Sequence, residues 1–368
     1  MKNRVLVCST EFPPLPGGIG AHAHGLIKEL SKDYEISLLT EVRGSKEHFL
    51  EFINENLTGQ KVIGVERHSW TVITYYNRIK EFFKAQRNKS HVIYSGKFYV
   101  WCSNFSSNDQ KSILVIHGSE LKQRGISKWL FGRALRKAEK VVCVSNYTKK
   151  KLFEYYKESI NTKTVVINNG FVGTSKNLRN MGARLTESKT NLLTIGGVHK
   201  RKGQQNVIQA LPAIIEQGFD PFYTLVGLPI ERAFMKEIAL DSGVVEKISF
   251  TGAVNEEDKW NAIDQSDIFL MLSEELENGD FEGFGIALME AMSRGVPVIG
   301  SRNSGIADAI EDKVSGLLVD PKNPEEVAEA VKEIMSNYES YSAGALKWSK
   351  NFTWTKIGAE YKQLIETP

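Results

Sequence analysis

Short apolar runs alternate with longer segments of helical periodicity along the whole chain. The runs are VLVC, ISLLT, SILVIHG, VVCVS and TVVIN in the first half, then NLLTIGG, YTLVG, ISFTG, IFLML and PVIG in the second. Runs of this length are typical of strands buried on both faces, and the helical segments between them suit crossover connections. The pattern predicts an α/β protein in which each half forms a doubly wound, Rossmann-like parallel sheet.

A polar interruption of this alternation marks the domain boundary. Residues 172–189, VGTSKNLRNMGARLTESK, are rich in Gly, Ser, Thr, Asn and Lys, which suits a connector better than a core element. The chain of 368 residues also exceeds what one hydrophobic core normally holds. We therefore expect an N-terminal domain over 1–175 and a C-terminal domain over 190–350. Residues 351–368 predict a final helix, and its periodicity leaves open whether it packs back on the N-terminal domain.

Cysteine usage and hydropathy indicate the compartment. Cys8, Cys102 and Cys143 are far apart, and two of them lie in apolar runs, so buried free thiols are expected and disulfides or metal ligands are not. The first apolar run has only four residues, which is too short for a secretory leader. No run reaches the roughly 18 apolar residues of a membrane span. We expect a cytoplasmic protein.

Charge divides unevenly between the halves. Residues 1–170 contain 27 Lys and Arg against 15 Asp and Glu, a net charge of +12, whereas the remainder carries −9. Two segments, 70–89 and 122–151, interleave basic with aromatic residues, which suits contact with an anionic membrane surface. The alternative is an ordinary amphipathic helix between core and water. Nucleic-acid binding is not expected, because no known nucleic-acid-binding motif accompanies the basic residues.

The richest chemical signal is DFEGFGIALMEAMSRGVPVIG, residues 280–300. It follows the apolar run at 268–272 and predicts a loop, a helix and a strand, with the loop at the carboxyl edge of the sheet, where ligands bind. Its glycines permit close backbone approach, and the first amides of the helix favour an anion such as phosphate. Two carboxylates, Glu282 and Glu290, accompany this apolar segment. A buried carboxylate needs hydrogen-bond donors; the alternative for Glu290 is a half-exposed glutamate at the edge of the helix.

The combination EGFGIALMEAMSRGVPVIG, continued by NSGIADAIEDKVSGLLVDP at 303–321, resembles the retaining, nucleotide-sugar-dependent glycosyltransferases of family 4, also called glycosyl transferases group 1. The resemblance runs in order through most of the second half. It implies the GT-B fold, two Rossmann-like domains facing each other across a cleft. It also implies transfer of a sugar from a UDP- or GDP-sugar to an acceptor hydroxyl, in glycan, polysaccharide or glycolipid biosynthesis.

The resemblance assigns donor binding to the second half. Glu290 is expected to hold the ribose hydroxyls, and Glu282 the donor sugar. Lys202 matches a lysine that binds the departing diphosphate, whereas Gly197 stands where the family usually has an arginine, so that Arg201 is the available substitute. The remaining donor contacts are expected from the loop and helix start, namely Gly283, Phe284, Gly285 and Ile286.

The first half matches the family at two places. In STEFPPLPGGIGAHAHGLIKEL, three glycines correspond to a loop near the donor phosphates and the acceptor, with Gly18 on the donor side and Gly17 and Gly20 on the acceptor side. In SILVIHGSE, His117 stands where the family has a histidine beside the reacting carbon, and Glu120 follows it. A plain turn and a structural histidine are the respective alternatives.

The implied mechanism needs no metal. The chain contains neither an Asp-Xaa-Asp triplet nor metal-ligand spacing, so the leaving diphosphate is expected to be neutralised by Lys202 and a helix N-terminus. The catalytic set is then His117, Lys202 and Glu282, with front-face substitution. Alternatives are a GT-B-like sugar phosphorylase, a nucleotide-sugar epimerase and a non-catalytic nucleotide-sugar-binding subunit.

Overall fold

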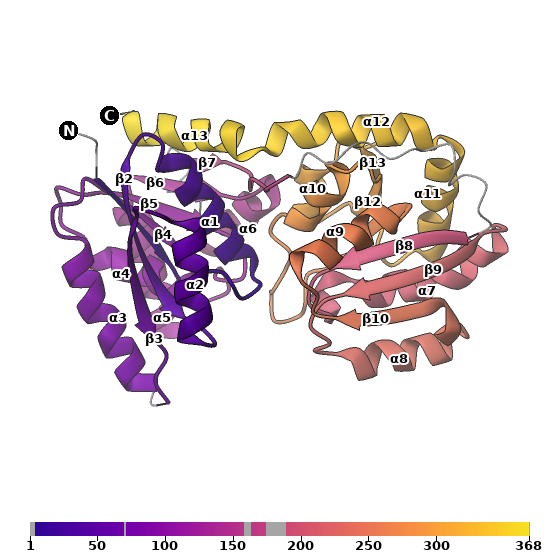
Figure 1. The fold of residues 1–368 in the computed structure, drawn as a ribbon, viewed down its shortest axis with the longest axis horizontal. Coiled ribbons are helices and arrows are strands. Elements are labelled where there is room, and N and C mark those ends of the chain that lie inside the picture. Colours follow the sequence, from indigo (N-terminus) through magenta and orange to yellow (C-terminus); the bar gives the residue numbers. More distant parts are fainter. Residues whose placement is uncertain (1–3, 70, 158–162, 174–188, 368) are drawn as a thin grey trace. The chain divides into compact units, whose positions relative to one another are not determined.

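The computed structural model describes residues 4–69, 71–157, 163–173 and 189–367. The chain divides into two compact units (Figure 1). Unit 1 comprises Met1–Phe171 together with Trp354–Pro368, and unit 2 comprises Val172–Thr353. Most of the connector that the sequence predicts, at 174–188, lies outside the described residues.

Unit 1 contains a fully parallel sheet. Its described strands follow the order β3-β2-β1-β4-β5-β6-β7, with bounds β1 (Arg4–Ser9), β2 (Glu35–Val42), β3 (Lys61–Glu66), β4 (His91–Ser95), β5 (Lys111–Ile116), β6 (Lys140–Cys143) and β7 (Thr164–Val166). Central strand β1 pairs with β2 on one side and β4 on the other, so Val7 lies opposite both Leu38 and Ile93. The strand order therefore reverses between β1 and β4.

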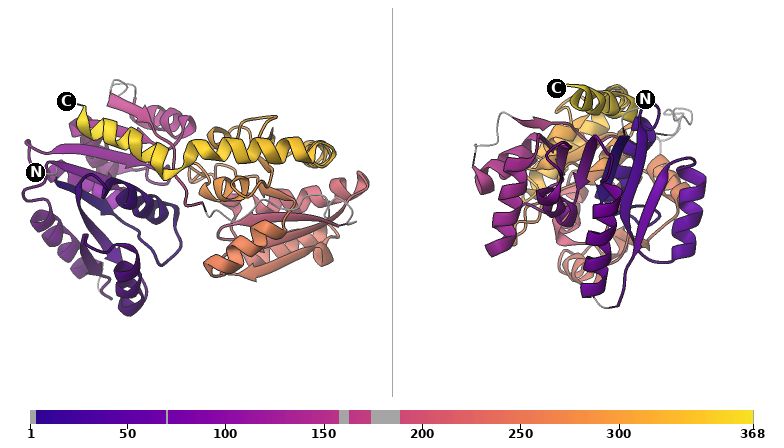
Figure 2. Two further views of the ribbon diagram at one scale, coloured as in Figure 1. Left: turned by 45° about the horizontal axis from the view of Figure 1, so that its top comes forward. Right: turned by 90° about the vertical axis from the view of Figure 1, so that its left-hand side faces the viewer.

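The helices of unit 1 lie on both faces of this sheet (Figure 2). They are α1 (Gly18–Leu30), α2 (Lys46–Asn56), α3 (Thr71–Ala85), α4 (Lys97–Cys102), α5 (Gly125–Lys137), α6 (Asn146–Tyr156) and α13 (Trp354–Glu366). Caps define some of the ends: Ser45 accepts a hydrogen bond from the His48 amide at the start of α2, and Ser145 accepts one from Thr148 at the start of α6.

The last helix, α13, packs against α1 within unit 1. Gly25 of α1 lies directly beneath the indole of Trp354, and a side chain at Gly25 would collide with that ring. On the next turns, the Tyr361 hydroxyl lies 3.3 Å from Nε2 of His22, and Lys362 lies 3.3 Å from Glu29. The sequence left the partner of this helix open, and these contacts assign it to the N-terminal unit.

Unit 2 repeats the architecture. Its described strands follow the order β10-β9-β8-β11-β12-β13, again all parallel, with bounds β8 (Lys189–Ile195), β9 (Asp220–Val226), β10 (Ile248–Gly252), β11 (Ile268–Met271), β12 (Val298–Ser301) and β13 (Gly316–Val319). The helices are α7 (Gln204–Glu216), α8 (Arg232–Asp241), α9 (Glu256–Gln265), α10 (Ile286–Met292), α11 (Pro324–Ser336) and α12 (Tyr338–Ser349). The order reverses between β8 and β11.

Two doubly wound parallel units were predicted, and both are present. Each apolar run identified in the sequence coincides with a strand. Strands β3, β4 and β13 were missed. β3, KVIGVE, lies at a sheet edge and buries only Val65 fully, so it lacks a continuous apolar run. β4 and β13 are short, with sequences HVIYS and GLLV.

Candidate functional site

The residues of unit 2 that the sequence predicts to bind the donor lie where the strand order reverses. Beyond the carboxyl end of β8 the chain forms the 3-10 turn η4 (Lys200–Lys202) before α7. Beyond β11 the loop at 272–285 leads into α10. Loops that leave neighbouring strands in opposite directions open a crevice at this point of a parallel sheet, which is where such sheets bind ligands.

Glu282 joins these two loops through an ion cluster. Its carboxylate lies 2.6 Å from Nζ of Lys202 and is hydrogen-bonded to Arg201, which also contacts Asp280 at 3.3 Å. Burial by itself raises the pKa of Glu282, but the charges and hydrogen bonds of Lys202 and Arg201 outweigh burial and hold the pKa at about 2. The two predicted diphosphate-binding cations, Arg201 and Lys202, therefore lie together, and Glu282 and Asp280 compensate their charges.

Glu290 also has a partner within the chain. Its Oε1 lies 2.9 Å from Nζ of Lys259, a residue of α9, and both side chains are largely buried. Burial raises the pKa of Glu290, with Lys259 opposing that rise. Lysine and arginine side chains therefore supply donors to both Glu282 and Glu290 within the chain, and the contacts of these two carboxylates with ligand hydroxyls stay a prediction.

Residues of the loop before α10 either permit its turn or pack into the core of unit 2. Gly285, the cap residue immediately before α10, adopts a left-handed conformation with φ 85°, which is why a glycine stands there. Phe284 is buried and packs against Phe352 with the two rings tilted and their centroids 5.5 Å apart, so it belongs to the core of unit 2. Gly283 is buried and Ile286 is partly exposed. Helix α10 has only seven residues, so its dipole is a smaller contribution than the nearby cations.

The matching residues of unit 1 lie at the carboxyl edge of its own sheet. Gly17 immediately precedes α1, and Gly18 and Gly20 form its first turn. His117 follows β5, and its Nε2 lies 2.9 Å from the Ser95 hydroxyl at the end of β4. Burial, together with His22, keeps the pKa of His117 well below its usual range, so the imidazole is neutral at physiological pH.

Glu120 is fixed by the loop that contains it. It is 3% exposed, and its carboxylate accepts hydrogen bonds from the His117 amide at 2.8 Å and the Ser119 hydroxyl at 3.5 Å. Burial raises the pKa of Glu120, and the backbone hydrogen bonds oppose the rise. Glu120 therefore positions the strand-end loop that carries His117, besides lining a pocket.

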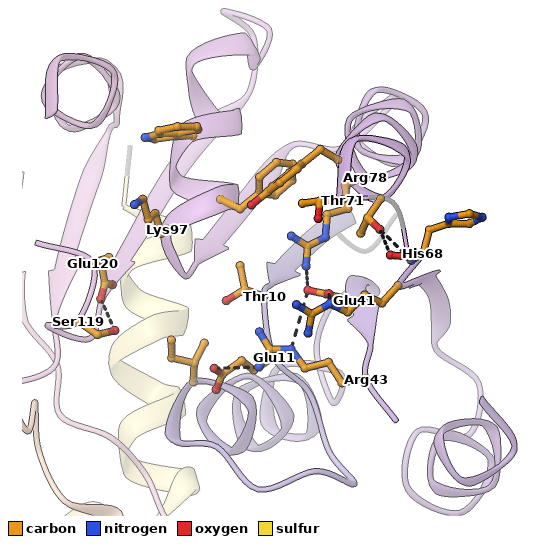
Figure 3. Close-up of a pocket in the computed structure, with 16 residues that line it drawn as sticks. Thr10, Glu11, Glu41, Arg43, His68, Thr71, Arg78, Lys97, Ser119 and Glu120 are labelled. Carbon is orange, nitrogen blue, oxygen red and sulfur yellow. Dashed lines mark hydrogen bonds and ion pairs between the residues drawn. The ribbon is translucent and has the colours of Figure 1, made fainter. Parts of the chain in front are cut away.

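That pocket encloses about 500 Å³ at the reversal between β1 and β4 (Figure 3). Four cationic residues line it, and the sequence prediction missed all of them: Arg43, Arg67, Arg78 and Lys97. Arg43 and Arg67 immediately follow β2 and β3, and Lys97 lies two residues beyond β4. Recognition of KVIGVE and HVIYS as strands would have placed two of these cations at the ligand edge.

Comparisons with known proteins agree with this arrangement. The family model described as glycosyl transferases group 1 matches residues 180–347, and the model described as glycosyltransferase family 4 matches residues 16–172. The chain belongs to glycosyltransferase family 4. An uncharacterized glycosyltransferase of Methanocaldococcus jannaschii is 24% identical over 392 residues, covering 97% of this chain and 96% of the relative.

Two further similarities concern a mannosyltransferase and a solved structure. A GDP-mannose-dependent alpha-(1-6)-phosphatidylinositol monomannoside mannosyltransferase of Mycolicibacterium smegmatis is 22% identical over 388 residues, covering 98% of each chain. The crystal structure of Anabaena HepE in complex with UDP and glucose superimposes with a TM-score of 0.76 over 99% of each chain, at 17% identity. The family 4 glycosyltransferase described here thus has the GT-B fold, as its sequence predicts.

Two features of this glycosyltransferase bear on metals and membranes. Within the described ranges, no three or more His, Cys, Asp and Glu side chains are grouped so that they could hold a metal ion. No helix among those residues has the length and apolar character needed to cross a bilayer.

Proposed function

We propose that this family 4 glycosyltransferase transfers a hexose from a UDP- or GDP-sugar to an acceptor hydroxyl with retention of the anomeric configuration. The observation that supports this most strongly is the cluster of Lys202 and Arg201 around Glu282 at the ligand edge of unit 2. Among the proteins compared, HepE was crystallised with UDP and glucose, and the mycobacterial relative uses GDP-mannose. A role in glycan, polysaccharide or glycolipid biosynthesis follows from such donors.

The diphosphate binds to the cations of this cluster. A lysine about 4 Å from a phosphate oxygen contributes on the order of 4 kcal/mol at a surface-like dielectric. The cations already lie beside a carboxylate, so they are held in place before the donor arrives. Arg201 takes the role of the arginine that Gly197 replaces, and no metal ion is required. Activity that survives chelation with EDTA supports this last point, and loss restored by a divalent cation contradicts it.

The chemical step is a front-face substitution. The acceptor oxygen forms a bond to the anomeric carbon as the bond from that carbon to the diphosphate oxygen breaks, and the acceptor proton passes to the departing phosphate oxygen. Glu282 orients the donor sugar and Glu290 the ribose, each while paired with a cation. Neutral His117 donates or accepts a hydrogen bond beside the reacting groups. Catalysis rests on diphosphate stabilisation and orientation.

A Lys202→Ala variant tests the proposal directly. With the donor identified by a thermal-shift screen of nucleotide sugars, kcat/KM is expected to fall by roughly 10²–10³. Lys236→Ala, an exposed lysine of α8, is the matched control. Nuclear magnetic resonance of the product reports the anomeric configuration. Full activity of Lys202→Ala, an inverted linkage, consumption of orthophosphate, or sugar conversion without an acceptor each contradicts the proposal.

Peripheral contact with the cytoplasmic face of a membrane is part of the proposal. Helix α3 exposes Val72, Tyr76, Ile79 and Phe83, which recur at helical spacing and form a solvent-facing apolar stripe. Basic residues Lys80, Lys84 and Arg87 are exposed on or just after the same helix. On α5, Ile126 and Trp129 are likewise exposed. An apolar stripe beside cations suits an anionic bilayer surface.

Co-sedimentation with vesicles tests this contact. Vesicles that contain phosphatidylglycerol should retain the wild-type protein, and a Val72→Ser, Tyr76→Ser double variant should bind much more weakly. Leu240→Ser, an equally exposed apolar position in unit 2, serves as the control. Equal binding by all three proteins contradicts a role for the α3 stripe.

A further inference from the structure

The pocket of unit 1 has an excess of positive charge, with four cationic residues against three carboxylates, Glu11, Glu41 and Glu120. Glu41, 5% exposed at the end of β2, contacts Arg78 and lies 3.8 Å from both Arg43 and Arg67. Figure 3 shows the Arg78 and Arg43 side chains converging on Glu41. One carboxylate compensates one of these three charges, and Arg43 also reaches Glu11 at 3.3 Å. At least one guanidinium charge therefore remains uncompensated.

Hydrogen-bonding capacity is also left over in this cluster. Arg78 is 6% exposed, and its Nε has no hydrogen-bond partner among the described residues. The buried Nε of Arg43 is in the same state. A buried guanidinium N–H without an acceptor is costly, so the arrangement favours a ligand that carries acceptor atoms. Arg78 is held in place by the rings of Tyr75 and Phe98, at 5.7 and 5.0 Å from their centroids.

Arg67 of this cluster and a further cation, Lys97, are exposed and can meet such a ligand. The Arg67 side chain is 73% exposed although it lines the pocket. Lys97 is exposed, and none of the ion pairs found in the described part of the chain involves it. In Figure 3 it lies across the pocket from Glu41, with Thr10 between them. An anion in the pocket would thus be approached by cations from more than one side.

The remaining lining suits a saccharide. Thr10, Thr71 and Ser119 offer hydroxyl groups, and Phe98 and Trp101 offer aromatic faces. Hydroxyl groups with aromatic rings match the alternating polar and apolar surfaces of a sugar ring. The same lining includes Glu120, the carboxylate beside the strand-end loop of His117.

The geometry points to an acceptor that is an anionic saccharide, whose phosphate or carboxylate group is bound by Arg67, Arg78 and Lys97 in this pocket. The inference rests on the proposed function and specifies its acceptor class. Glu41 keeps the guanidinium groups oriented, and the oxyanion supplies the charge that Glu41 alone does not. Arginine suits this task because its planar fork matches two oxygens of a phosphate or carboxylate.

Binding of small probes to the full chain tests the site. Isothermal titration calorimetry is performed with glucuronate, glucose 6-phosphate and glucose. The two anionic sugars should bind, and glucose should not. Arg67→Gln and Lys97→Gln should each raise the Kd for at least one anionic sugar by about tenfold or more, the effect of one lost charge-assisted contact. Because both side chains are exposed, these variants should fold normally.

Two matched variants distinguish binding in this pocket from a general effect of charge and from binding at the Lys202 cluster. Lys61→Gln removes an exposed cation at the amino end of β3, the strand whose carboxyl end precedes Arg67, and should leave binding unchanged. Lys202→Ala should leave glucuronate binding unchanged and weaken nucleotide-sugar binding. Equal loss in Lys61→Gln, or loss confined to Lys202→Ala, overturns the inference. A nucleotide sugar that binds while neither anionic sugar does overturns the inference alone, and failure of any nucleotide sugar to bind overturns the proposed function.

Separate experiments distinguish a soluble phosphate, a soluble carboxylate and a lipid-borne phosphate as the source of the anionic group. Preference for glucose 6-phosphate identifies a phosphate, and preference for glucuronate identifies a carboxylate. Phosphatidylcholine vesicles with and without phosphatidylinositol supply a lipid-borne phosphate, and co-sedimentation that is lost in Arg67→Gln but kept in Lys61→Gln supports that source. Arg67→Lys should recover part of the binding. No response to soluble or vesicle-borne anions refutes the inference.

Discussion

Replacement of Glu282 by glutamine should destabilise unit 2 and at the same time improve its binding of pyrophosphate. The carboxylate is 13% exposed and pairs with Lys202, which is 14% exposed, and with Arg201, which is 20% exposed. A glutamine at this position would keep the size of the side chain but leave two largely buried cations with only Asp280 nearby. Removal of one member of a buried ion pair is strongly destabilising.

The magnitude follows from the pKa. A folded-state value of about 2, against an ordinary value of 4.5, corresponds to about 3 kcal/mol. Because the cluster retains some contact with solvent and Asp280 remains, we expect the free energy of unfolding to fall by about 2–3 kcal/mol. For a unit of this size the melting temperature should then fall by roughly 4–12 °C.

The pH dependence has a defined sign. The folded-state pKa of Glu282 is depressed, so its contribution to stability is complete above about pH 4.5 and is lost as the pH falls toward 2. The stability difference between the wild type and Glu282→Gln should therefore shrink over that range. Differential scanning calorimetry measures it, with Glu329→Gln, an exposed glutamate of α11, as the control.

Pyrophosphate provides the second half of the test. In the wild type the ligand must share Lys202 and Arg201 with the Glu282 carboxylate. Without that negative charge, pyrophosphate should bind at least about fivefold more tightly, since removal of one unit charge about 4 Å from the ligand changes the binding free energy by about 1–4 kcal/mol. The reasoning is refuted if Glu282→Gln has the same melting temperature as Glu329→Gln, or if pyrophosphate raises the melting temperatures of both variants equally.

Two further predictions concern unit 1. Burial lowers the pKa of His22 to about 4, so between pH 6.5 and 4 the unfolded chain binds a proton that the folded chain does not. The free energy of unfolding should therefore fall by about 2–3 kcal/mol as the pH is lowered from 6.5 to 4. Urea unfolding of His22→Gln should show a weaker dependence of this free energy on pH, and an unchanged dependence contradicts the assignment. Gly25→Ala should lower the melting temperature, because the added methyl group meets Trp354 and overpacking costs about 1–3 kcal/mol. Gly18→Ala, in the same helix but facing open space, should not.

The local pattern of residues was enough to predict both sheets and to locate candidate residues at the ligand edge of unit 2. Buried parallel strands must be apolar on both faces, so ISLLT, VVCVS and IFLML are recognisable without any partner. The sequence likewise predicts a phosphate-binding edge from Lys202 and from the stretch around Glu282 and Glu290, because strand, glycine turn and helix are contiguous there. Edge strand β3 escaped notice since half of its side chains face solvent.

What only tertiary structure decided is which charges meet. Lys259 lies 31 residues from Glu290, and Glu41 lies 37 residues from Arg78, and nothing local in either segment signals a partner. Parallel topology brings the carboxyl ends of strands distant in sequence to one edge, so the pairing of their side chains depends on strand order. The cationic pocket arises in the same way, because its lining comes from the carboxyl ends of β1, β2, β3, β4 and β5 and the segments that follow them, which meet at one edge of the sheet.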